Sequence, residues 1–340
     1  IYKKKLIRFP MKIIDSVGGD NLTKSEKQSL GILGLTLVLA SFYILGAKAP
    51  SYEEDVSLEQ TEFLLAQMTD NRIDEFFESL DLRASSVLIV NSDTKQKIYG
   101  RETDRVMPLA SLVKIMTAVV TMENIGESEI ITIPKEALGL TGDNGLLVDE
   151  KWGRDELLRF MLITSSNDGA RAVAMHLGQK MGQESPEQSV AVFVDLMNKK
   201  AKDLGLQNTI FLNESGLDQE DGKNGGYSNS KEIVSLFDYA IKTYPDIFSS
   251  TSFGAKTFTS VSMKDHNALN TNPNVGQVLG ISASKTGFTN ISGGNLIVSF
   301  KTPKGETVIV GVLGSTFTER FTDIEKLSAT TLKIINEVQL

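Results

Sequence analysis

Cysteine is absent from this 340-residue chain, and histidine occurs only twice. The missing cysteine excludes a disulfide framework, a thiolate zinc site and a cysteine nucleophile. His176 and His266 are too few for most histidine-rich metal sites, so we expect neither a metal nor a cofactor. Neither histidine has a recognisable nucleophile-elbow partner, which argues against a histidine-dependent serine hydrolase.

Basic residues are scarce relative to acidic ones outside the first 28 positions. Residues 1–28 carry seven Lys or Arg against three Asp or Glu, a balance of +4, whereas the whole chain carries −8, so the remainder carries −12. An acidic main body argues against a nucleic-acid partner, which would require a basic face. The 41% hydrophobic and 23% charged content is typical of a globular protein with a packed core.

Residues 28–47 form an uncharged run rich in Leu, Ile, Val and Phe. As a helix, this run would span about 30 Å, the thickness of a bilayer's hydrocarbon core, and it predicts a transmembrane anchor. Residues 1–27 are then a cytoplasmic basic head, because Lys and Arg precede the run and acidic residues follow it. The main body is expected outside a bacterial cytoplasmic membrane. The alternative is secretion after cleavage near Ala49, although Pro50 would fit poorly just after the cut.

The rest of the chain divides into an acidic stalk, residues 48–82, and a catalytic domain, residues 83–340. Strand-like segments occur near both ends of this domain, and helical patterns occur between them. The sequence therefore predicts an α/β fold of the α+β type, with one antiparallel sheet flanked by helices and a mainly helical subdomain at about residues 120–275. The expected strands are 87–90, 97–99, 280–284, 295–301 and 307–313, and a helix at 321–340 is expected to close the chain.

Ser-x-x-Lys occurs four times, starting at Ser92, Ser111, Ser228 and Ser282. Ser92 lies in a predicted hairpin turn, and Ser228 is expected to cap a helix. Ser282 lies on a predicted strand, where residues three apart point to opposite faces. Ser111 differs because it is expected to open a long helix that carries Lys114 one turn later on the same face.

A helix N-terminus suits a nucleophilic Ser111, because its free N–H groups stabilise negative charge. Lys114 could act as the base if burial or a nearby cation kept its amine neutral. Taken alone, the tetrapeptide is better explained by an N-cap serine and an exposed lysine.

Two further motifs favour the catalytic interpretation. Ser165-Ser166-Asn167 lies between predicted helices, and Lys285-Thr286-Gly287 ends a predicted strand. With Ser111 and Lys114 they follow the order of the three motifs of penicillin-binding proteins and class A β-lactamases. Each motif is weak alone, but the ordered set in fitting structural contexts is specific.

The chain resembles the low-molecular-mass penicillin-binding proteins, the serine-type D-alanyl-D-alanine carboxypeptidases. The resemblance covers about residues 83–325 and implies the β-lactamase/DD-peptidase-like fold. It rests on the three motifs and on intervening segments that include Phe193-Val194-Asp195-Leu196-Met197-Asn198, Gly216-Leu217-Asp218 and Gly293-Gly294.

The resemblance implies a role for each motif residue. Ser111 would attack the bond between the two terminal D-alanines of a peptidoglycan stem peptide, and Lys114 would accept its proton. Ser165 would relay a proton to the leaving amine, and Asn167 would hold Lys114 and the substrate. Among the substrate-binding residues, Lys285 would supply positive potential, Thr286 would bind the terminal carboxylate, and Gly287 would let the substrate backbone approach closely. The backbone N–H groups of Phe288 and Ser111 would form the oxyanion hole. Arg320 would bind the carboxylate or, equally, occupy a plain surface position.

Several alternatives remain open. A class A β-lactamase would need a glutamate that activates water, but Glu184 and Glu187 lack the expected surrounding pattern. Slow deacylation, with β-lactams as covalent inhibitors, is therefore expected. DD-endopeptidase activity, or an inactive peptidoglycan-binding membrane protein, would preserve much of the same sequence.

Overall fold

A computed structural model of the chain describes residues 73–142, 145–278 and 280–338. The chain divides into two units, residues 1–66 and 67–340, and the described residues all belong to the second. The predicted basic head, the predicted membrane segment and residues 48–72 of the predicted stalk lie outside the described residues. Within the described part, no helix has both the length and the apolar character needed to cross a bilayer.

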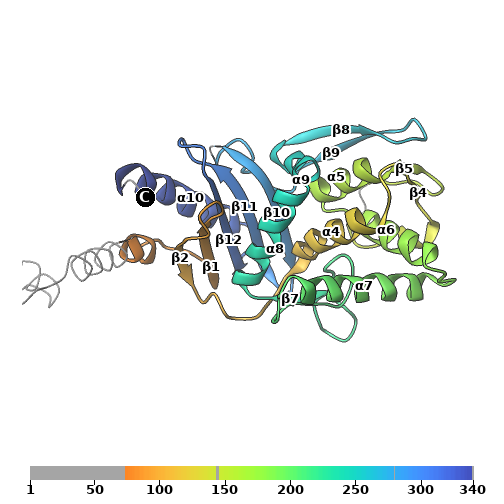
Figure 1. Cartoon of the computed structure of the whole chain (residues 1–340), viewed down its shortest axis with the longest axis horizontal. Coiled ribbons are helices and arrows are strands. Elements are labelled where there is room, and N and C mark those ends of the chain that lie inside the picture. Colours follow the sequence, from red (N-terminus) through yellow and green to blue (C-terminus); the bar gives the residue numbers. More distant parts are fainter. Residues whose placement is uncertain (1–72, 143–144, 279, 339–340) are drawn as a thin grey trace, which may run out of the picture. The chain divides into compact units, whose positions relative to one another are not determined.

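A five-stranded sheet forms the centre of the described unit (Figure 1). The strand order is β10-β11-β12-β1-β2, and every neighbouring pair is antiparallel. The strands are β10 (Ile281–Thr289), β11 (Gly293–Lys301), β12 (Thr307–Ser315), β1 (Ser86–Asn91) and β2 (Lys97–Arg101). The predicted antiparallel sheet built from both ends of the domain is confirmed. The third motif lies on β10, one of the two edge strands of this sheet.

Most of the helices fall between β2 and β10 in the sequence, as predicted, and α10 follows β12. The helices are η1 (Ala110–Val113), α4 (Lys114–Asn124), η2 (Lys135–Ala137), α5 (Arg154–Thr164), α6 (Asn167–Lys180), α7 (Pro186–Asp203), α8 (Ser230–Thr243), α9 (Pro245–Phe248), η3 (Ser249–Ser252) and α10 (Glu319–Val338). Short strands accompany them: β3 (Met107–Pro108), β4 (Ile130–Thr132), β5 (Lys151–Gly153), β6 (Ile210–Phe211), β7 (Gly226–Ser228), β8 (Ala255–Thr259) and β9 (Asp265–Leu269). In Figure 1, α4 to α7 gather beside one end of the sheet.

Both faces of the sheet are buried, because successive side chains of a strand point to opposite faces. On β12, Val308 and Val310 belong to the apolar cluster that includes Ile324 of α10, whereas Ile309 belongs to the cluster that includes Phe237 of α8. A register slip of one residue would exchange these two faces, so burial on both sides fixes the pairing of the strands.

The two ends of the described unit meet at Asp323 of α10. Its buried carboxylate accepts hydrogen bonds from the backbone N–H groups of Arg83 at 3.0 Å and Ala84 at 2.8 Å, and from Ser315 Oγ at 2.7 Å. This one side chain therefore ties the start of β1 and the end of β12 to the closing helix.

Residues 73–78 are helical and pack against the same body. The ring of Phe77 is buried and stacks on Tyr99 of β2, with 4.6 Å between the ring centroids. The division into a stalk at 48–82 and a domain at 83–340 stays a prediction, but the described end of that stalk packs against the domain.

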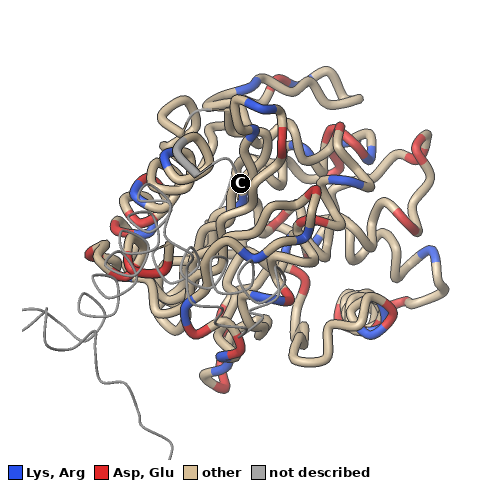
Figure 2. Tube along the Cα trace, turned by 60° about the vertical axis from the view of Figure 1, so that its left-hand side comes forward, with Lys and Arg blue, Asp and Glu red and all other residues tan. Residues whose placement is uncertain are grey.

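Charged residues of both signs are distributed over the described part. Figure 2 shows Lys and Arg interspersed with Asp and Glu along the trace. Individual buried charges near the site, rather than a patch of one sign visible along the trace, are described below.

Candidate active site

Ser111 lies in a tight turn between β3 and α4. Ala110 before it has a φ of +48°, in the left-handed region that costs a non-glycine residue about 1–2 kcal/mol. The turn that follows is a 3₁₀ helix, Ala110–Val113, and α4 begins only at Lys114. The prediction that Ser111 opens the long helix was therefore wrong by one turn. Residues i and i+3 eclipse in a 3₁₀ helix, so Ser111 and Lys114 still share a face.

Lys114 has three polar neighbours. Its Nζ lies 3.0 Å from Ser111 Oγ, 2.6 Å from Asn167 Oδ1 and 2.7 Å from the backbone oxygen of Ser215. A neutral amine has two N–H donors and one lone pair. Because the amide and backbone oxygens can only accept, they take the two N–H groups and leave the lone pair for the Ser111 hydroxyl. The contacts therefore suit a base positioned to take the Ser111 proton.

Burial lowers the pKa of Lys114 from its ordinary value near 10.5 to about 7. The side chain is fully buried, and loss of hydration disfavours the ammonium form. The carboxylate of Glu214 acts in the opposite direction and raises the pKa. Glu214 is itself buried and pairs with Arg171 at 3.4 Å. A base effective near neutral pH thus results from desolvation moderated by one carboxylate.

Asn167, the first residue of α6, is held in the orientation that Lys114 needs. Its Nδ2 donates to the backbone oxygen of Thr141, which fixes the amide so that Oδ1 faces Lys114. The next residue, Asp168, accepts a hydrogen bond from the N–H of Leu140 at 3.1 Å. The loop around residues 140–141 is therefore tied to the second motif.

Ser165 lies at the junction of α5 and α6 and reaches the third motif. It ends α5 with a left-handed φ of +60°, and its Oγ lies 2.8 Å from Lys285 Nζ. Ser166 caps α6 by accepting the N–H of Gly169 at 3.0 Å. The middle serine of the motif therefore starts the helix, while the first serine faces the site.

Lys285 lies within β10, because that strand stays paired with β11 as far as Thr289 opposite Gly293. The prediction that the motif ends the strand was wrong. Burial lowers the pKa of Lys285 well below its ordinary value, and the nearby charges of Lys114 and Arg320 lower it further. Two buried amines therefore compete for protonation in one site.

Gly287 contacts the nucleophile turn directly. A Cβ at this position would lie 2.8 Å from the backbone oxygen of Leu109 and 3.2 Å from the N atom of Ser111. We predicted a glycine that admits the substrate backbone, but the space left by its missing side chain is filled by the turn that carries Ser111. Beside it, Thr286 Oγ1 lies 2.6 Å from Thr271 Oγ1.

Arg320, at the start of α10, is buried with 4% exposure. The alternative prediction, a plain surface position for this arginine, was therefore wrong. Its Nη1 donates to the backbone oxygen of Gly287 at 2.7 Å. Burial lowers its pKa to about 10. The side chain of Phe288 is 39% exposed and forms an edge-on pair with Phe317 at 4.9 Å between centroids.

Two buried asparagines that sequence reasoning missed hold the nucleophile turn in place. Asn224 Oδ1 accepts the N–H of Ala110 at 3.0 Å, and Asn295 Nδ2 donates to the backbone oxygens of Pro108 and Leu109, each at 3.0 Å. Asn295 was visible as a polar residue at the head of an apolar strand. Asn224, in a loop rich in Gly and Asn, gave no such signal.

The other three Ser-x-x-Lys serines have different roles. Ser92 follows β1 and bonds to Asp238, and Ser282 lies on β10 as predicted. The prediction that Ser228 caps a helix was wrong, because it ends β7 and Asn229 caps α8 by accepting the N–H of Glu232 at 2.9 Å. Of the four, only Ser111 is hydrogen-bonded to the lysine of its own tetrapeptide within the described residues.

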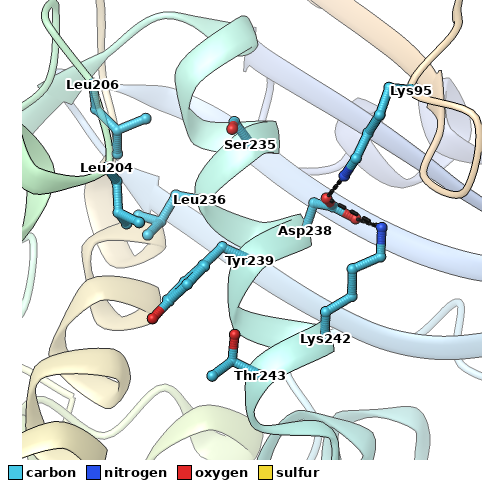
Figure 3. Close-up of a pocket in the computed structure, with 9 residues that line it drawn as sticks. All are labelled: Lys95, Leu204, Leu206, Ser235, Leu236, Asp238, Tyr239, Lys242 and Thr243. Carbon is cyan, nitrogen blue, oxygen red and sulfur yellow. Dashed lines mark hydrogen bonds and ion pairs between the residues drawn. The ribbon is translucent and has the colours of Figure 1, made fainter.

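A separate hollow of about 300 Å³ lies between α8 and the chain after α7 (Figure 3). Leu204 and Leu206 line one side, and Asp238 binds Lys95 and Lys242 on the other, the second at 3.0 Å. This ion cluster joins the β1–β2 turn to α8. None of the predicted site residues lines the hollow, so we assign it no part in the chemistry.

Comparison with known proteins shows the family. The family model for D-alanyl-D-alanine carboxypeptidases, peptidase family S11, matches residues 73–316. The chain belongs to this family. Among curated family members, D-alanyl-D-alanine carboxypeptidase DacF of Bacillus subtilis is 28% identical over 72% of this chain and 61% of its own length. A D-alanyl-D-alanine endopeptidase of Escherichia coli is 28% identical over 64% of this chain and 67% of its own length. The chain thus spans about three fifths to two thirds of these relatives.

Solved structures of penicillin-binding proteins and DD-peptidases have the same fold as this chain. Penicillin-binding protein D2 of Listeria monocytogenes, in an ampicillin-bound form, is 29% identical with a TM-score of 0.61, covering 74% of this chain and 98% of its own. A variant of the Streptomyces K15 DD-transpeptidase is 25% identical with a TM-score of 0.66, at the same coverages. The mixed fold of helices and antiparallel sheet is therefore shared with DD-peptidases.

Proposed function

We propose that this chain is a serine-type D-alanyl-D-alanine carboxypeptidase that cleaves the terminal D-Ala–D-Ala bond of peptidoglycan stem peptides. The observation that carries the proposal is the contact of Lys114 Nζ with Ser111 Oγ at 3.0 Å, made by a buried amine with a pKa of about 7. A lysine can accept a proton only in its neutral form, and strongly shifted pKa values cluster at functional sites.

In the acylation step, Ser111 Oγ bonds to the carbonyl carbon of the penultimate D-alanine while its proton passes to Lys114. The carbonyl oxygen becomes an oxyanion, which the backbone N–H groups of Ser111 and Phe288 would stabilise. Gly287 supports this arrangement, because its Cα packs against the Ser111 turn and brings the two backbone segments together. Removing one oxyanion donor typically costs about 10²–10³ in rate.

The C–N bond then breaks, and the leaving D-alanine amine takes a proton. Ser165 would deliver it, passing on the proton held by Lys114. Its Oγ already lies 2.8 Å from Lys285 Nζ, so a hydrogen-bond partner orients the relay. The product of this step is an ester between Ser111 and the shortened stem peptide.

The terminal carboxylate of the substrate would lie beside Lys285 and Thr286. Lys285 has a lowered pKa in the free protein because it is buried near two other basic groups. An arriving carboxylate would raise that pKa and favour the ammonium form. Lys285 would therefore gain its full charge when substrate binds.

Water hydrolyses the ester and restores Ser111. Glu184 and Glu187, the glutamates considered for a β-lactamase-like step, are exposed around the start of α7. Slow deacylation, with β-lactams as covalent inhibitors, fits that exposure and the ampicillin-bound Listeria relative.

Product analysis tests the proposal. We expect the purified chain to release one D-alanine from a defined stem pentapeptide, and Ser111→Ala to release none. Endopeptidase activity is the second candidate, favoured by relatives of that name in Escherichia coli and Pseudomonas aeruginosa. If cross-linked dimers are cleaved while the pentapeptide stays intact, endopeptidase activity is favoured over carboxypeptidase activity.

We also propose that residues 28–47 anchor the chain in a bacterial cytoplasmic membrane with the catalytic domain outside. The uncharged run and the basic residues before it support this proposal. Recovery of a mature N-terminus at Pro50 from cells would contradict it and favour secretion.

A further inference from the structure

The peptide bond between Gly287 and Phe288 has both of its polar groups in positions relevant to catalysis. In a trans peptide the C=O and the next N–H point in opposite directions, and no described residue has a cis peptide bond. The Gly287 oxygen accepts the Arg320 guanidinium at 2.7 Å. The N–H on the other side of the same bond belongs to Phe288, the proposed oxyanion donor.

Arg320 reaches that oxygen from α10 by crossing β11 at Gly294. A Cβ on Gly294 would lie 3.2 Å from Arg320 Cδ and 2.0 Å from the backbone oxygen of Thr316. Gly294 is also the residue paired with Phe288 in the sheet. Glycine at this position therefore leaves the path along which the arginine approaches the peptide bond.

Aromatic rings surround the guanidinium. Its Cζ lies 4.6 Å from the ring centroid of Phe321, 4.9 Å from that of Phe317 and 5.8 Å from that of Phe288. The residue is 4% exposed, and its buried Nε has no hydrogen-bond partner among the described residues. The rings therefore hold the guanidinium in place, with its Nη1 already bonded to the Gly287 oxygen.

We propose that Arg320 is a positioning residue that fixes and polarises the Gly287–Phe288 peptide bond, so that the Phe288 N–H is held ready for the oxyanion. This inference rests on the proposed function. It assigns Arg320 a role in addition to the expected contact with the substrate carboxylate. A charged donor on a carbonyl strengthens the N–H of the same amide, because hydrogen bonds in a chain polarise one another.

The test compares two acyl donors on wild type and Arg320→Lys. One is an acyl-D-alanyl thioester ending in a free carboxylate, and the other is its uncharged methyl ester. Lysine keeps the positive charge but loses the planar fork and its stacking. We expect the acylation rate constant to fall about tenfold for both donors, with little change in the concentration dependence. This is less than the loss of a whole oxyanion donor.

Arg154→Lys is the matched control. Arg154 is also buried and donates Nη1 to a backbone oxygen, that of Ile125, at 2.7 Å, but it lies at the start of α5. It should lose stability without losing acylation rate per folded molecule. A loss confined to the carboxylate-bearing donor, or a loss that appears only as weaker binding, would overturn the proposal and leave Arg320 with the carboxylate role alone.

A second measurement does not depend on activity. With ¹⁵N-phenylalanine labelling, the Phe288 amide resonance should shift in Arg320→Lys and stay in place in Arg154→Lys. An unshifted Phe288 amide would refute the polarising contact. If Arg320→Lys does not fold, Arg320→Gln takes its place in both measurements. Wild type that acylates neither donor would refute the proposed function, and the amide shift would then decide the inference separately.

Discussion

At the scale of single residues, the chemistry depends on the protonation state of Lys114. Its pKa of about 7 means that the amine is half neutral near physiological pH. Only the neutral form can accept the Ser111 proton, so the rate of acylation should rise as pH increases through about 7 and then level off. The acid limb of the rate of penicillin acylation against pH measures this directly. A rate that is flat between pH 5.5 and 8.5 would contradict it.

Glu214 offers a directional check on the same residue. Its carboxylate raises the pKa of Lys114, so Glu214→Gln should move the acid limb to lower pH and increase the relative rate at pH 6. Arg171→Gln is the opposite control. It removes the cation paired with Glu214 at 3.4 Å and leaves the negative charge less compensated, so the limb should move to higher pH. Shifts in the same direction for both variants would refute the electrostatic account.

At the scale of elements, the Ser111 turn is held by glycine contacts as well as by hydrogen bonds. Gly216 has a φ of +84°, and a Cβ there would lie 1.9 Å from the backbone oxygen of Ala110 and 3.0 Å from the N atom of Ser111. Gly216→Ala should therefore displace the nucleophile. A misplacement of about 1 Å can cost about 10²-fold in rate, and we expect a loss of at least that size in penicillin acylation.

Gly222→Ala separates this steric effect from backbone strain. Gly222 has a φ of +80°, but a Cβ there would meet nothing within 4 Å. The left-handed conformation should cost each variant about 1 kcal/mol of unfolding free energy, and Gly216→Ala should lose more because the backbone at Ala110 must shift. Only Gly216→Ala should lose acylation rate per folded molecule. Equal acylation rates for the two variants would contradict the role of the contact between Gly216 and the Ser111 turn.

The sequence predicted the elements more completely than it predicted their joints. Hydrophobic patterns located the strands and helices, because burying one face of a strand or helix repeats apolar residues at a fixed spacing along the chain. The start of α4 was misplaced, because the positive φ of Ala110 depends on contacts with distant residues. Asn224, which holds that residue, is 114 positions away in the sequence. Such a pairing leaves no local pattern.

The same distinction applies to the candidate site. The spacing of Ser111 and Lys114 and the order of the three motifs were sufficient to nominate residues that the fold brings together. The neighbouring groups that set the pKa values and orientations of these residues could not be predicted from the sequence. Glu214 acts on Lys114 from a loop, and Arg320 contacts Gly287 across β11. Electrostatic partners need only be close in space, so no spacing rule identifies them.

At the scale of the whole molecule, Asp323 connects the start of β1 to the closing helix. Asp323→Asn would weaken its bonds to the N–H groups of Arg83 and Ala84 and to Ser315. Bonds to a buried charge each contribute about 1.5–3 kcal/mol, so we expect a loss of about 2 kcal/mol of unfolding free energy in urea. Asp81→Asn, at a side chain 78% exposed, should change it by less than about 0.5 kcal/mol. Equal losses of unfolding free energy in Asp323→Asn and Asp81→Asn would contradict the proposed role of Asp323 in joining β1 to α10.

The central claim is that Ser111 is the nucleophile of a DD-peptidase, and covalent capture by a penicillin tests it most directly. Mass spectrometry of the purified chain after incubation with benzylpenicillin should show one added penicilloyl group, and peptide mapping should place it on Ser111. Ser111→Ala should take up none, while Ser282→Ala, another serine of the Ser-x-x-Lys pattern, should be labelled like wild type. An unmodified wild type, or an adduct that persists in Ser111→Ala, would contradict the account.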